Sequence, residues 1–135
     1  MKKMNVTDKR SSVHKQARDQ LSGLSIMFLL GMAVNLIGLP SEVDGGAKIA
    51  TRIFLILHGI IGLSLAIGAI SVVARARNSS YAQAARIGLV TIVLTVVCGI
   101  LTAITKSNWW SYAMAVGFLA DFWIYGLLFI KTDKE

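Results

Sequence analysis

Four long apolar runs, separated by short polar segments, make up most of this 135-residue chain. The hydrocarbon core of a bilayer is about 30 Å thick, and an α-helix of roughly 20 apolar residues crosses it. Backbone N–H and C=O groups inside a bilayer must be paired within their own segment, as they are in a helix. The pattern therefore predicts an all-α integral membrane protein, with runs at Leu21–Leu39, Ile53–Ala74, Ile87–Ile104 and Trp109–Ile130.

The polar segments between the runs are short and have the composition of turns. The first helix must end before Pro40, since proline cannot extend it. Short connections make consecutive helices antiparallel neighbours, so we expect an up-down bundle over residues 21–130. A polar basic segment, 1–20, would precede this bundle and a short tail, 131–135, would follow it. The predicted helices cover about 21–39, 48–75, 81–105 and 109–130.

The basic segment at residues 1–20 admits two interpretations. It is rich in Lys and Arg and holds few apolar side chains, so it is either disordered or a helix that lies on anionic headgroups. Its apolar residues are too sparse to favour the amphipathic helix over the disordered tail.

Charge orients the expected bundle. The chain is 55% hydrophobic and 16% charged, and its net charge of +7 comes from 14 Lys and Arg. Eleven of the 14 fall on the side that carries both termini and the Arg75–Arg86 connection, and three fall on the other. The positive-inside rule then places both termini in the cytoplasm. We expect a multi-pass plasma-membrane protein, and the short loops suggest a prokaryotic one. The basic charge is explained by topology, so no nucleic-acid partner is expected.

Polar residues inside the predicted spans are the candidates for function. Asp121 lies near the middle of the fourth run, where a carboxylate needs a partner or a proton. It is either a neutral residue that holds helices together or a group that binds a ligand, a proton or an ion. The third run carries a polar face, and depth along the helices suggests one inner polar seam that would bind a ligand. That face comprises Thr91, Thr95, Cys98, Thr102 and Thr105, and the seam comprises Asn35, His58, Thr95, Thr102 and Asp121.

His58 gives the chain its one candidate for haem ligation inside the membrane. Leu57-His58-Gly59, Cys98-Gly99 and the Trp-rich turn before the fourth run resemble one four-helix half of the haem A synthase type, and small membrane b-type cytochromes, over residues 53–130. That resemblance implies a haem b cofactor. Such bundles use a second histidine near the start of the fourth helix, which this chain lacks. His58 with Met114, or His58 paired across an oligomer, would have to hold the iron.

No motif for catalysis by a single chain is present. The sequence lacks cysteine pairs, metal-ligand spacing, a Ser-His-Asp set and a phosphate-binding loop. We therefore expect a non-enzymatic membrane protein that acts in the bilayer as a homo-oligomer or as a subunit of a larger membrane complex. The alternatives are a haem-binding electron-transfer or haem-handling protein that uses His58, and an oligomeric channel or proton-coupled carrier that uses Asp121.

Overall fold

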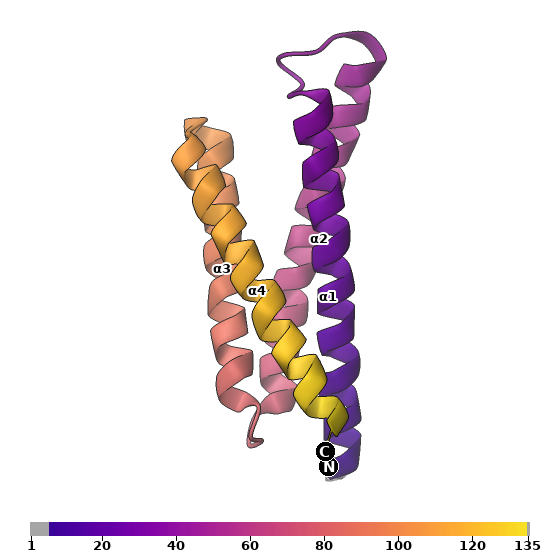
Figure 1. Cartoon of the computed structure of the whole chain (residues 1–135), viewed down its shortest axis with the longest axis vertical. Helices are drawn as coiled ribbons and strands as arrows, with labels where there is room; N and C mark the ends of the chain where they lie inside the picture. Colours follow the sequence, from indigo (N-terminus) through magenta and orange to yellow (C-terminus); the bar gives the residue numbers. More distant parts are fainter. Residues whose placement is uncertain (1–5, 135) are drawn as a thin grey trace.

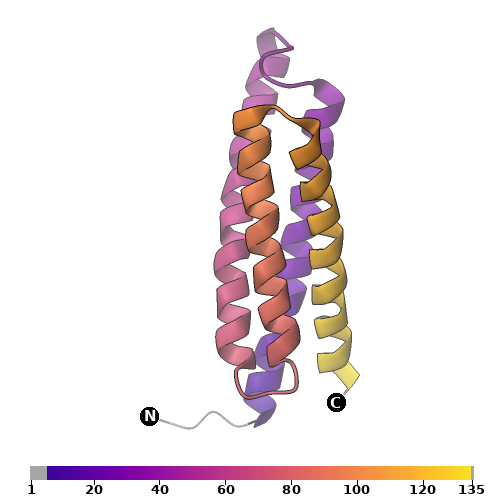
Figure 2. The ribbon, with the colours of Figure 1, turned by 90° about the vertical axis from the view of Figure 1, so that its left-hand side faces the viewer.

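The computed structural model describes the backbone of residues 6–134 and the side chains of residues 10–133. It contains four α-helices: α1 (Val6–Ile37), α2 (Gly45–Ala76), α3 (Ala82–Thr105) and α4 (Asn108–Lys134). All four are long and apolar enough to cross a membrane, as the sequence predicted. The start of α1 and the end of α4 lie at one end of the molecule with the α2–α3 connection, and the other two connections lie at the opposite end (Figures 1 and 2).

Local chemistry sets the ends of the helices. After α1, Gly38 adopts a φ of +104°, which favours glycine, and its N–H still bonds the carbonyl of Val34 at 2.9 Å. The carboxylate of Glu42 then accepts the N–H of Leu39 at 3.0 Å. At the end of α3, Lys106 takes a left-handed conformation, and its N–H closes the last turn on the Thr102 carbonyl. These turns keep the connections at this end of the molecule short.

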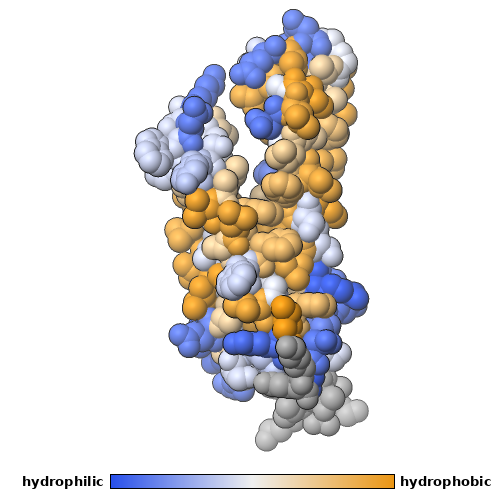
Figure 3. All heavy atoms as spheres, viewed as in Figure 1, coloured by the Kyte–Doolittle hydropathy of each residue, from blue (hydrophilic) through white to orange (hydrophobic). Residues whose placement is uncertain are grey.

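The buried core lies in the half of the molecule near the termini. Helix α1 lies against α2, and α3 lies against α4, while α1 also contacts α4 and α2 contacts α3. On α3, no described residue beyond Thr95 is buried, and on α4 none before Asp121 is buried. Beyond that level the α1–α2 pair and the α3–α4 pair diverge, which leaves an open space between them (Figures 1 and 3). The core cluster comprises Val13, Ala17, Leu24, Leu65, Ala69, Val72, Ala76, Tyr81, Ala85, Ile92, Tyr125 and Leu128.

Helix α1 starts at Val6, so the described part of the basic N-terminal segment is helical and continuous with the first apolar run. Residues 6–20 continue the axis of α1, while residues 1–5 lie outside the described part of the chain. Val13, Ala17 and Gln20 are buried at helical spacing, and that face continues the packed face of the span. A count of apolar residues does not reveal this face, because small and amide side chains also pack.

The start of α1 is held by the end of α4. The ring of His14 stacks on Phe129 with centroids 4.4 Å apart, and its Nδ1 lies 3.1 Å from the hydroxyl of Thr132. Arg10 donates from Nε to the Thr132 carbonyl at 2.9 Å. Because that carbonyl belongs to the last turn of α4, a cation there is also favoured by the helix dipole.

We expect the amides of residues 13–20 to exchange with deuterium as slowly as those of the α2 core. The physical reason is that every one of these amides is helical and that one face of the segment, with Val13, Ala17 and Gln20, is buried, so exchange requires the start of α1 to detach. Hydrogen exchange followed by mass spectrometry on the protein in nanodiscs measures this. The α2–α3 connection at residues 77–80 serves as the fast-exchanging reference. Exchange of residues 13–20 at the rate of that connection would contradict the continuous helix.

Candidate functional site

The centre of the candidate site is Asp121, on α4. Its side chain is only 1% exposed. Two hydroxyls from successive turns of α3 approach its carboxyl group: Thr91 Oγ1 hydrogen-bonds with Oδ1, and Thr95 Oγ1 lies 3.1 Å from Oδ2. Of the predicted seam, the structure therefore brings Thr95 and Asp121 together.

Gly117 allows α3 to come this close. It lies one turn before Asp121 on α4 and faces the Thr95 side chain. A Cβ at this position would lie 3.3 Å from Thr95 Cβ and would overlap the Thr95 hydroxyl. The small residue thus sets the separation of the two helices at the height of the carboxyl group, as small residues do at helix interfaces in membranes.

The two hydroxyls can serve either charge state of Asp121. Each hydroxyl has one hydrogen and a second acceptor in its own helix: Thr95 Oγ1 lies 2.8 Å from the Thr91 carbonyl, and Thr91 Oγ1 lies 3.1 Å from the Ile87 carbonyl. An ionised carboxylate would accept both hydrogens, whereas a protonated one would donate to a hydroxyl that has turned its hydrogen to its own helix. The two ion pairs of the described side chains lie elsewhere. Rotation of the two hydroxyls therefore lets the site satisfy either charge state of Asp121.

Tyr125 extends the site by one turn toward the termini. Its ring is fully buried, and its hydroxyl has no hydrogen-bond partner among the described residues. It packs against Gly88, where a Cβ would lie 3.1 Å from the hydroxyl oxygen. Thr91 and Tyr125 were absent from the predicted seam. The signal for both was available: Thr91 belongs to the polar face of the third run, and Tyr125 follows Asp121 at the i+4 spacing that places side chains on one helix face.

The other predicted members of the seam lie apart from Asp121. His58, on α2, bonds through Nδ1 to the Met27 carbonyl of α1 at 3.2 Å. Since a carbonyl only accepts, that nitrogen carries the hydrogen. The Thr102 hydroxyl donates a hydrogen bond to the Cys98 carbonyl of its own helix at 2.8 Å. Asn35 is exposed, two residues before α1 ends. Depth along each helix gave the height of these residues but not the direction in which they face.

The two residues considered for haem also occupy different helix pairs. His58 packs within the α1–α2 pair beside Gly31, whereas Met114 packs within the α3–α4 pair, with its sulfur facing Gly99. These pairs diverge toward the end where both residues lie (Figure 1). Among the described residues, no group of three or more His, Cys, Asp and Glu is placed to hold a metal ion.

Comparison of the chain with protein-family models, with curated proteins and with solved structures gave no match.

Proposed function

We propose that the protein is a non-enzymatic subunit of a membrane assembly, and that a second copy of the chain occupies the space between its two diverging helix pairs. In this proposal the four helices cross a prokaryotic plasma membrane in alternating directions, with both termini in the cytoplasm. The excess of Lys and Arg at the end that carries the termini supports that orientation. The end with the diverging pairs would then lie in the outer leaflet.

The observation that carries the proposal is the one-sided core. Buried side chains join the two pairs near the termini, and the stacked rings of Phe28 and Phe118, with centroids 5.6 Å apart, connect α1 with α4 near mid-height. Outward of these rings the pairs separate (Figure 3). Packing between helices in a bilayer depends on close contact rather than on hydrophobicity, so an open space between helices is unused packing surface.

A transmembrane helix fits that surface better than lipid alone. Small residues are exposed on the outer halves of the helices, among them Gly59 on α2, Ala103 on α3 and Ala115 on α4. A Cβ at Gly59 would meet nothing within 4 Å. Small exposed residues allow the backbones of two helices to approach closely. In a two-fold dimer, the α3–α4 pair of each copy would enter the space of the other, so one arrangement would fill both.

The oligomeric state tests this proposal. In nanodiscs or in dilute lipid, we expect the mass of a dimer, and we expect Ala103→Trp with Ala115→Trp to weaken dimerisation at least tenfold by blocking close approach. Ala74→Trp, at an exposed position of α2 near the termini, is the matched control and should leave the dimer intact. A monomer at every protein-to-lipid ratio, or equal effects of the two sets of substitutions, would refute the second copy as the occupant.

A further inference from the structure

A second polar region lies away from Asp121, in a groove between α1 and α2. The groove has a volume of about 290 Å³ and is lined by Gln16, Asp19, Gln20, Gly23, Ile61, Ser64, Leu65 and Gly68. Its polar lining residues on α1 precede the apolar run that begins at Leu21, whereas its lining residues on α2 lie within the apolar run Ile53–Ala74. The groove therefore joins the polar start of α1 to an apolar face of α2.

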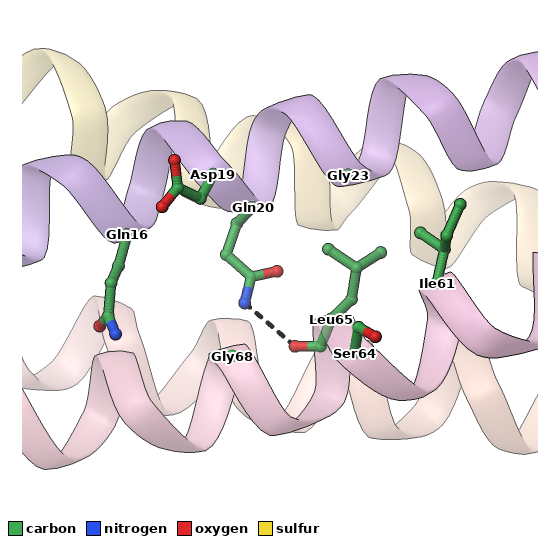
Figure 4. A pocket seen from close by; sticks show the side chains of 8 residues that line it. All are labelled: Gln16, Asp19, Gln20, Gly23, Ile61, Ser64, Leu65 and Gly68. Atoms are coloured by element: carbon green, nitrogen blue, oxygen red, sulfur yellow. Dashed lines mark hydrogen bonds between the residues drawn. The ribbon is translucent and has the colours of Figure 1, made fainter.

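Gln20 is the residue that marks the groove as a binding site. Its side chain is 3% exposed and reaches from α1 across to α2, where Nε2 donates to the Leu65 carbonyl at 3.0 Å (Figure 4). The Leu65 carbonyl can only accept a hydrogen bond, so the Gln20 atom that faces it must be the amide nitrogen. This fixes the orientation of the Gln20 amide. Gln20 Oε1 is thus left buried in the groove with no hydrogen-bond partner. Leaving a buried acceptor unpaired is energetically unfavourable, so a donor is expected there.

A second acceptor lies one turn away. Gln16 Oε1 is also buried without a partner, and the Gln16 side chain extends from α1 toward α2 beside Gly68 (Figure 4). Asp19 supplies the one formal charge among the lining residues, and it is negative. The Arg18 guanidinium lies 3.6 Å from the Asp19 carboxylate, and both groups are exposed, so Arg18 competes only weakly for that carboxylate. The groove thus offers hydrogen-bond acceptors and a negative charge. A ligand that is both a cation and a hydrogen-bond donor would complement it.

We propose that this groove binds a primary ammonium group carried on an apolar tail. The ammonium N–H groups would donate to the amide oxygens of Gln16 and Gln20, near the carboxylate of Asp19. The tail would lie along Gly23, Ile61 and Leu65. The volume decides against a bare metal cation, since it approaches that of small-molecule sites. Two sources share this chemistry: the ethanolamine headgroup of a lipid and a free lipophilic amine.

Thermal unfolding of the full chain in nanodiscs tests the proposal, with octylamine as the probe and tryptophan fluorescence as the signal. In phosphatidylcholine nanodiscs, we expect octylamine to raise the unfolding temperature in a saturable way. Octyltrimethylammonium has the same charge and tail but no N–H donor, so it should give no saturable shift. Equal shifts from octylamine and octyltrimethylammonium, or no shift from octylamine, would overturn the proposal and leave water as the occupant.

Substitutions locate the binding. Gln16→Leu removes an acceptor that bonds nothing in the protein, so the fold should persist while the affinity for octylamine falls about tenfold. Gln83→Leu makes the same change at an exposed position of α3 and should leave the affinity unchanged. Asp19→Asn, at an exposed position, should weaken binding severalfold and provides a second variant if Gln16→Leu folds poorly. Unchanged affinity in both groove variants would refute the site.

The lipid composition separates the two sources. If the ethanolamine headgroup is the ligand, nanodiscs that contain phosphatidylethanolamine should raise the unfolding temperature of the parent but not of Gln16→Leu, and octylamine should add little. If a free amine is the ligand, octylamine should shift the parent equally in both compositions. Dimer formation is measured separately, so failure of either proposal leaves the other standing.

Discussion

Asp121→Leu is expected to lower the free energy of unfolding by about 2–4 kcal/mol. The substitution removes two hydrogen bonds between α3 and α4, each worth about 0.6–1.7 kcal/mol in a membrane. It also forces a bulkier side chain into a site that is 1% exposed, and overpacking costs about 1–3 kcal/mol. Reversible unfolding of the purified protein in mixed detergent micelles measures the change.

Asp121→Asn separates the effect of losing the hydrogen bonds from the effect of placing a bulkier side chain at this buried position. An amide can donate to one threonine hydroxyl and accept from the other, so this variant should lose about 1 kcal/mol or less. Asp133→Leu alters an exposed carboxylate of the same helix and should change stability by less than about 0.5 kcal/mol. A double-mutant cycle of Asp121→Ala with Thr95→Val, in which each single substitution removes the contact, isolates the contact between these two residues. If Asp121→Leu were as stable as the parent, the carboxyl group would have no structural role.

Gly117→Val should be the most damaging single substitution of a glycine on α4. The new Cβ would overlap the Thr95 hydroxyl and lie 3.3 Å from Thr95 Cβ, so α4 would have to move away from α3. We expect a loss of about 1–3 kcal/mol from overpacking. The shift would also lengthen the contact between Thr95 and Asp121, which adds to the loss. The same unfolding measurement applies.

Gly126→Val is the matched control, because it makes the same change on the same helix. A Cβ there would meet nothing within 4 Å. Valine has a slightly better helix propensity than glycine, so this variant should be neutral or gain a few tenths of a kcal/mol. The difference between the two variants isolates the clash at Gly117. Equal stability of both would mean that α3 and α4 do not pack at the separation described here.

The sequence by itself determined the number and type of the helices and the approximate extent of three of the four. Four apolar runs of spanning length leave no other structure for backbone groups in a bilayer, and Pro40 marks an end that no tertiary contact could remove. The polarity of Asp121 against its apolar neighbours also singled it out. Each of these conclusions depends on residues close together in the chain, so local chemistry was sufficient.

Only the tertiary structure decided which polar residues meet. Thr95 reaches Asp121, while His58 bonds to Met27 and Asn35 is exposed, because the rotation of each helix about its axis selects the partner. Height along a helix, which the sequence does give, leaves that rotation open. The course of α1 through residues 6–20 was likewise decided by contacts with α4, which lies more than 100 residues away in the chain. Apolar periodicity there is too weak to reveal a packed face that only distant residues complete.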